Sequence, residues 1–160
     1  MYKKMRRSDK ALSPEETRAL LDRCEYGVLA TADADGQPYA LPISYAVLND
    51  AIYIHSALHG QKIDNLKANP KVCFSVVADT QPVWDNDFTT YYTSCVVYGK
   101  ARLVTDEREK RDALIGLVRK YLPEHMDKAE EIMAQTWKST LVYAISLEHV
   151  TGKAKKRKAS

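Results

Sequence analysis

The sequence lacks any uninterrupted apolar run of roughly 20 residues, the length that a membrane-spanning helix requires. Its first ten residues are basic and polar with no apolar stretch behind them, so a secretory signal is not expected either. These two absences predict a cytoplasmic protein without membrane contact. With 160 residues, the chain has the size of one ordinary domain, which can bury a core without disulfides or a structural metal.

Cysteine is also scarce. The three cysteines, Cys24, Cys73 and Cys95, are widely spaced and lie in apolar surroundings. An odd number without short spacings predicts reduced thiols in the core rather than disulfides or zinc ligands. The four histidines show no metal-ligand spacing, so no metal site is predicted.

The formal charge of +3 hides an uneven distribution. Nine of the 24 basic residues lie in segments 1–7 and 153–158, which leaves 15 against 21 acidic residues in the body, or about −6. We therefore expect a basic N-terminal segment (1–12), a central domain (13–152) and a basic C-terminal tail (153–160). Because the tail has no interleaved aromatic residues, solvated ends are favoured over contact with nucleic acid.

The spacing of apolar residues predicts a mainly β protein. Ser13, Pro14 and Glu16 occupy the N-cap, first-turn and capping-box positions of a helix. Strands are predicted at 28–31, 39–48, 51–55, 72–77, 89–104 and 141–147, helices at 56–69, 105–122 and 124–137, and a polar link at 79–87. Consecutive hairpins do not suit a parallel sheet, whose strands alternate with crossover helices. The expected fold is a six-stranded antiparallel barrel with peripheral helices.

Segment 52–63 carries the clearest chemistry, because a strand there runs into a helix. Unpaired N–H groups and the positive end of the helix dipole favour a phosphate at such a junction. Ser56 supplies a hydroxyl, Gly60 allows close approach of the backbone, and Lys62 adds a cation. Since Gly-Gln-Lys is not a Walker motif, these residues alone leave Lys62 equally open to being a solvated helix lysine.

Short motifs at 27–31, 36–45, 52–57, 60–62 and 69–74 have a characteristic order and spacing. Through them, residues 20–153 resemble the FMN-binding split-barrel superfamily related to pyridoxamine 5'-phosphate oxidase. Within that superfamily, the chain is most similar to the branch of 5-nitroimidazole resistance proteins. The resemblance implies a split barrel that works as a homodimer, with FMN at the subunit interface.

The resemblance also implies which residues hold the cofactor. Two strands and the strand-to-helix corner of one subunit would bind most of it, and the second subunit would add a strand. The residues are Leu41, Pro42, Ile43, Ser44 and Tyr45 along the flavin, His55 and Ser56 near the ribityl chain and phosphate, Gln61 and Lys62 on the phosphate, and Thr93, Ser94, Cys95 and Val96 from the second subunit. Trp84 or Trp137 would cover the ring.

Two departures from the oxidases themselves bear on the substrate. Leu41 stands where many of them carry an arginine, so phosphate binding would depend more on Lys62 and helix amides. The C-terminal arginine and histidine that they use for pyridoxal phosphate are not evident, which argues against vitamin B6 as substrate.

His55 is the candidate catalytic residue, because it ends a strand at the mouth of the predicted site and the nitroimidazole-resistance branch has a histidine in this context. It would polarise a nitro or carbonyl group or relay a proton. The alternative is a histidine whose hydrogen bonds are satisfied by backbone at a strand end.

Three functions remain open from the sequence. The first is an FMN-dependent oxidoreductase that takes electrons from transiently docked NADH or NADPH and reduces a small substrate such as a nitroaromatic. The second is a non-catalytic module that stores or senses flavin or haem, with His55 or His149 as a possible axial ligand. The third is an interaction protein whose basic tail recruits nucleic acid.

Overall fold

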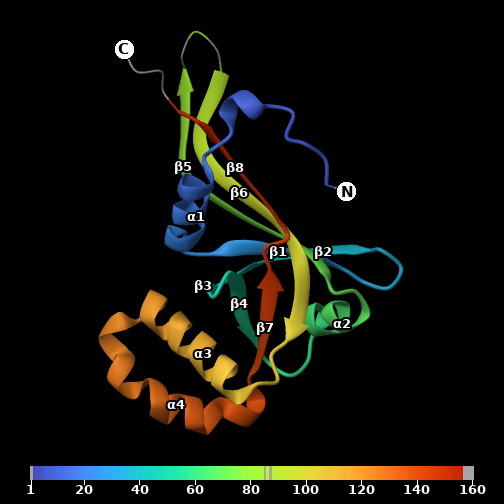
Figure 1. The fold of residues 1–160 in the computed structure, drawn as a ribbon, viewed down its shortest axis with the longest axis vertical. Coiled ribbons are helices and arrows are strands. Elements are labelled where there is room, and N and C mark those ends of the chain that lie inside the picture. The colour runs from blue at the N-terminus through green and yellow to red at the C-terminus, as the bar shows by residue number, and fades with distance from the viewer. Residues whose placement is uncertain (1, 85, 87, 157–160) are drawn as a thin grey trace.

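The computed structural model describes residues 2–84, 86 and 88–156 (Figure 1). Its helices are α1 (Pro14–Arg23), α2 (Gln61–Ala68), α3 (Glu107–Tyr121) and α4 (Ala129–Thr136), with short 3-10 turns at Ser8–Lys10, Pro123–Lys128 and Trp137–Ser139. Its strands are β1 (Gly27–Ala32), β2 (Pro38–Ile43), β3 (Ala46–Leu48), β4 (Ala51–Ser56), β5 (Lys71–Trp84), β6 (Phe88–Leu103), β7 (Leu141–Ser146) and β8 (His149–Lys155). The expected mainly β fold, an antiparallel split barrel with peripheral helices, is confirmed, although the described residues form eight strands rather than six.

The strands follow the order β2-β1-β5-β6-β7-β4-β3, and β8 pairs with β6. Strand β6 belongs to both halves of the barrel: Tyr98 pairs with His149 of β8, whereas Ala101 pairs with Ile145 of β7. Gly99 lies between these two pairings, and a Cβ atom there would stand 1.8 Å from the carbonyl oxygen of Ser146. The crossing of β6 over the end of β7 therefore requires a residue without a side chain.

Several elements differ from their expected bounds, among them the helix expected at 124–137, which is a 3-10 turn up to Lys128 and continues as α4 from Ala129. The strand expected at 39–48 is interrupted at Ser44 and Tyr45, which separate β2 from β3. Helix α2 begins at Gln61 rather than at residue 56. The expected polar link at 79–87 instead continues β5 to Trp84, with a register irregularity between Ala78 and Gln81. Residues 149–155 form β8, which continues past the expected domain boundary at residue 152.

The N-terminal segment lies against β8. The backbone N–H of Leu12 donates to the carbonyl oxygen of Gly152 at 3.0 Å, and Ala11 forms a β-bridge with Lys153. In Figure 1 this segment, β8 and the long β5–β6 hairpin occupy one end of the molecule, and α3 with α4 occupies the other. Both basic stretches of the sequence therefore lie at the hairpin end as far as the structure describes them.

Large side chains fill the inside of the barrel. Leu29, Ile54 and Phe74 have no exposed surface, and Tyr45 packs edge-on against Phe74 with 4.8 Å between ring centroids. A second apolar cluster joins α3 and α4 to the outer faces of β4 and β7. None of the helices in the described ranges combines the length and the apolar composition that crossing a bilayer demands.

Candidate functional site

The junction between β4 and α2 has the backbone geometry of an anion site. Gly60 precedes the helix with φ +127°, a conformation that residues with a side chain rarely adopt. No side chain in the described chain caps α2, so the first helical N–H groups have no side-chain acceptor. The N–H groups of Ile63 and Asp64 donate to the Gly60 carbonyl oxygen at 2.8 and 3.1 Å, so the amides before them and the positive end of the helix dipole would meet an external acceptor.

The charge of Lys62 acts on His55 at this junction. In β4, His55 is more exposed than its neighbours Ile54 and Ser56, both of which are buried. Burial lowers the pKa of His55, and the charge of Lys62 lowers this pKa further. Burial also lowers the pKa of Lys62. Burial thus disfavours the charged forms of His55 and Lys62, and an anion bound beside them would favour these charged forms.

Strand β2 supplies the second wall of the site. Its side chains alternate: Leu41 and Ile43 pack against the barrel core, whereas Pro42 is exposed, as is Ser44 just after the strand. Among the described strands, β2 ends the strand order, so one of its edges has no neighbouring strand there. Strand β3, which follows Ser44 and Tyr45, pairs Ala46 with Tyr53 of β4, two residues before His55.

A buried polar network fixes α2 against this wall. The Nδ2 atom of Asn65 donates to Oγ1 of Thr31 at 3.0 Å, and that hydroxyl donates to the carbonyl oxygen of Tyr39 at 3.3 Å. Asn65 and Thr31 are both buried. They tie the helix that carries Lys62 to β1 and β2, and the sequence reasoning missed them. The available signal was a polar residue, Asn65, between Ile63 and Leu66 on the apolar side of the helix.

Tyr45, expected beside the flavin, is placed in the barrel core. Its hydroxyl donates to the carbonyl oxygen of Leu21, and its backbone N–H donates to the Tyr121 hydroxyl at 2.9 Å. The Lys120 ammonium lies 3.6 Å from the centroid of the Tyr45 ring. Burial raises the pKa of Tyr45. Its side chain is thus part of the protein interior, unlike the exposed Pro42 and Ser44 before it.

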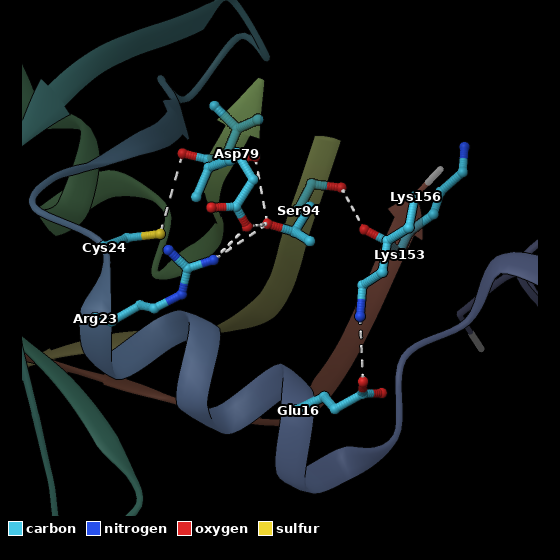
Figure 2. Close-up of polar contacts among 10 residues, drawn as sticks. Glu16, Arg23, Cys24, Asp79, Ser94, Lys153 and Lys156 are labelled. Atoms are coloured by element: carbon cyan, nitrogen blue, oxygen red, sulfur yellow. Dashed lines mark hydrogen bonds and ion pairs between the residues drawn. The ribbon is translucent and has the colours of Figure 1, made fainter. Parts of the chain in front are cut away.

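Other candidate residues lie elsewhere in the chain. Thr93 and Ser94 occupy the middle of β6, where the Thr93 hydroxyl donates to the Asp79 carboxylate at 2.6 Å and the Ser94 hydroxyl donates to the Lys153 carbonyl at 3.5 Å (Figure 2). Trp137 lies between α3 and α4, with the Lys110 ammonium 4.3 Å from its ring centroid. Within one chain, the candidate residues on β2, β4 and α2 therefore lie together, whereas Thr93, Ser94 and Trp137 lie in other regions.

No group of three His, Cys, Asp or Glu side chains is arranged to hold a metal ion within the part of the chain that the structure describes. The chemistry that this corner offers is recognition of an anion, by the start of α2, Lys62 and His55.

The family profile described as pyridoxamine 5'-phosphate oxidase matches residues 13–154. The chain belongs to the pyridoxamine 5'-phosphate oxidase family. The resemblance inferred from the sequence motifs is thereby confirmed at the level of the superfamily. The matched range contains the whole β2–β4–α2 corner and nearly all of β8.

Solved structures show the same fold. A candidate 5-nitroimidazole antibiotic resistance protein from Bacteroides thetaiotaomicron is 22% identical, with 91% of this chain and 90% of that chain covered and a TM-score of 0.75. A FAD-binding protein from Mesorhizobium loti is 25% identical, with 92% of this chain and 98% of that chain covered and a TM-score of 0.65.

A curated relative, an uncharacterized protein from Rhizobium meliloti (strain 1021), is 39% identical over 62 residues. This match covers 34% of the present chain and spans 40% of the length of that relative.

Proposed function

We propose that this member of the pyridoxamine 5'-phosphate oxidase family binds FMN at the β2–β4–α2 corner. We further propose that it acts as a homodimeric oxidoreductase that reduces a small substrate such as a nitroaromatic compound. One observation carries the proposal: α2 begins after Gly60 without a side-chain cap, directly beside the partly buried cation of Lys62 and beside His55. The likeness to a FAD-binding protein of similar length supports a flavin as the ligand.

The phosphate is the part of FMN that this corner suits best. Lys62 and the first amides of α2 would bind its oxygens, with Gln61 and Ser56 alongside. Burial of the Lys62 ammonium has a desolvation cost, which a dianionic phosphate would offset through charge-assisted hydrogen bonds. With Leu41 at the start of this wall in place of an arginine, Lys62 is the cation on which phosphate binding depends.

The isoalloxazine ring would lie outside the barrel, because Leu29, Ile54 and Phe74 leave no room inside. One side of the ring would face Pro42 and Ser44, while the unpaired edge of β2 offers backbone hydrogen bonds to its polar rim. The other side needs a cover, which we assign to a second copy of the chain. That copy would supply the β6 strand around Thr93 and Ser94, together with Trp137.

Bound FMN would supply the redox chemistry, taking electrons from transiently docked NADH or NADPH and passing them to the substrate. In the protein without FMN, burial and the charge of Lys62 lower the pKa of His55 and so favour its neutral form. An imidazole at this place would donate a hydrogen bond to a nitro or carbonyl oxygen of the substrate.

Calorimetric titration with FMN tests the site. Lys62→Ala should weaken FMN binding by about 10- to 100-fold, the size expected for a lost charge-assisted hydrogen bond. The matched control is Lys67→Ala in the last turn of α2, which removes an exposed lysine from the same helix and should change the affinity little. Riboflavin, which lacks the phosphate, should bind wild type and Lys62→Ala alike. Equal FMN affinity in wild type and Lys62→Ala would reject the proposed phosphate site.

Turnover is tested separately, by anaerobic reduction of the FMN-loaded protein with NADH or NADPH followed by addition of a nitroaromatic. His55→Gln should slow reoxidation by the nitroaromatic while FMN remains bound. Flavin that binds but is not reduced would instead favour the storage or sensing module, and a haem spectrum in the purified protein would contradict the flavin assignment. Sedimentation that shows only monomer with FMN bound would rule out the interface site.

A further inference from the structure

We propose that the hairpin end of the molecule binds a free nucleotide that carries at least two phosphate groups. This inference goes beyond the proposed flavin site and uses none of its α2 residues. Two adjoining hollows lie between the β5–β6 hairpin, β8 and the N-terminal segment, and Lys155 lines both of them. We call them the basic hollow and the aromatic hollow.

The basic hollow has a volume of about 760 Å³ and is lined by Arg7, Asp9, Lys10, Tyr91, Ala154, Lys155 and Lys156. Its four cations outnumber its single carboxylate, Asp9, which forms an ion pair with Arg7 at 2.6 Å. Glu16 of α1 approaches Lys156 at 3.4 Å from one side (Figure 2). The size falls within the roughly 300–1,000 Å³ of small-ligand sites, and the excess of positive charge favours an anion.

The aromatic hollow has a volume of about 720 Å³ and includes Trp84, Phe88 and Tyr92 among its lining residues. Trp84 is 66% exposed and Phe88 is 87% exposed, although both are large apolar side chains. Their rings meet edge to face, with 4.9 Å between centroids. Exposed aromatic rings beside cations are the combination with which proteins bind nucleotides, since a base stacks on the ring while cations bind the phosphates.

Strand pairing brings these two kinds of side chain together. Strand β8 lies along β6 with Tyr92 opposite Lys155, and the Lys153 ammonium is 5.7 Å from the centroid of the Tyr92 ring. In the sequence, no aromatic residues are interleaved with the basic tail, because the two strands are far apart in the chain. In the fold, Lys153 and Lys155 of β8 both lie near Tyr92 of β6.

The charge distribution favours a free nucleotide over a nucleic acid strand. The basic stretches 1–7 and 153–158 lie at the hairpin end as far as the structure describes them, whereas residues 8–152, which include the hairpin, carry a net charge of about −6 by sequence count. A compact ligand with two or more phosphates would remain within the basic hollow. A longer polyanion would continue past it into an unfavourable field.

Calorimetric titration of the FMN-saturated protein with ADP tests this site, since bound FMN prevents ADP from entering the flavin corner. ADP should bind saturably in wild type. Lys10→Ala and Lys155→Ala should each weaken it about tenfold, as for one charge-assisted contact to phosphate. Trp84→Ala should weaken both ADP and adenosine, and adenosine should be insensitive to Lys10→Ala. Lys138→Ala, which removes a lysine from the 3-10 turn before β7, is the matched control and should leave ADP affinity unchanged.

Three results would each overturn the inference. The first is an absence of saturable ADP binding, or ADP affinity that neither Lys10→Ala nor Lys155→Ala changes. The second is tighter binding of a thymidine oligomer of about 12 nucleotides than of ADP, which would assign the surface to single-stranded nucleic acid. The third is a pair of findings: wild type does not bind ADP, and Trp84→Ala dissociates a dimer. Together they would assign the aromatic hollow to contact between two copies of the chain. FMN affinity is measured independently, so failure of this site is distinguishable from failure of the flavin site.

Discussion

Two polar networks hold elements around β1 and β5, and they differ in the charge and in the burial of their side chains. Asn65, Thr31 and the Tyr39 carbonyl form an uncharged chain that is shielded from water. Arg23 and Asp79 form an ion pair whose side chains are 51% and 53% exposed, joined by the Thr93 hydroxyl (Figure 2). Water can hydrogen-bond to Arg23 and Asp79 in place of their partners, whereas it has little access to the buried Asn65 and Thr31. The uncharged network should therefore contribute more to stability.

The largest expected effect comes from breaking the buried network at its helix side. Asn65→Ala removes the amide and leaves a small cavity, so the free energy of unfolding should fall by about 2–3 kcal/mol. Because Asn65 tethers the helix that carries Lys62, FMN affinity should fall as well. Urea unfolding measures the first effect and calorimetry the second. A stability loss within the ordinary range of surface substitutions would show that the network is less important than its burial suggests.

A subtler change breaks the same network at its strand side. Thr31→Val keeps the shape of the side chain but leaves the Asn65 amide without its acceptor, which should cost about 1–2 kcal/mol. Adding Asn65→Leu to Thr31→Val removes the orphaned donor. The double variant should then lose less stability than the two single variants added together, and additive losses in this double-mutant cycle would contradict a direct coupling.

The exposed network should respond much less. Arg23→Ala should lower the free energy of unfolding by no more than about 1 kcal/mol, and the difference from wild type should shrink in high salt. Hydrogen bonds from Thr93 and Arg23 lower the pKa of Asp79. The stabilisation is therefore present above the ordinary aspartate pKa of about 3.9 and is lost as the pH falls through the lowered value. A difference that persists in full below that range would exclude the ion pair as its source.

The smallest expected effect concerns the electrostatic contact at the candidate site, which is intermediate in burial between the two networks. Removing the Lys62 charge should raise the pKa of His55, because that charge is one of the two causes of its lowering. A proton NMR titration of the histidines measures this, with Lys67→Ala as the control that should leave His55 unchanged. Bound FMN should raise the same pKa in wild type. An unchanged His55 titration in Lys62→Ala would place the two side chains too far apart to share a ligand.

The sequence predicted those features that depend on neighbouring residues. The capping box of Ser13 and Glu16 is present, because both partners lie within one helical turn. The succession of a strand and a helix around Ser56 and Lys62 was likewise predicted, although the helix begins at Gln61 rather than at residue 56. The antiparallel class followed from consecutive hairpins.

Features that depend on distant pairing were not predictable in this way. Segment 149–155 contains lysines and a glycine and was interpreted partly as a tail, yet it becomes a strand because β6 offers it an edge to pair with. Thr31 and Asn65 lie 34 residues apart, so neither indicates its partner in the sequence. The family resemblance implied Tyr45 along the flavin, whereas its side chain lies in the core after the turn between β2 and β3. Tertiary contacts decide each of these cases.

The pairing of β4 with β7 also has a consequence for how the protein is made. Ala51 pairs with Ser146, a separation of 95 residues, and β6 reaches β7 through α3 and α4. During synthesis, the edge of β4 that pairs with β7 therefore stays unpaired until residues 141–146 have left the ribosome. Contacts of such long range are associated with slow folding, and an unpaired strand edge can meet another chain in the interval. Nascent chains of this protein should thus depend on shielding of β4 until residues 141–146 emerge.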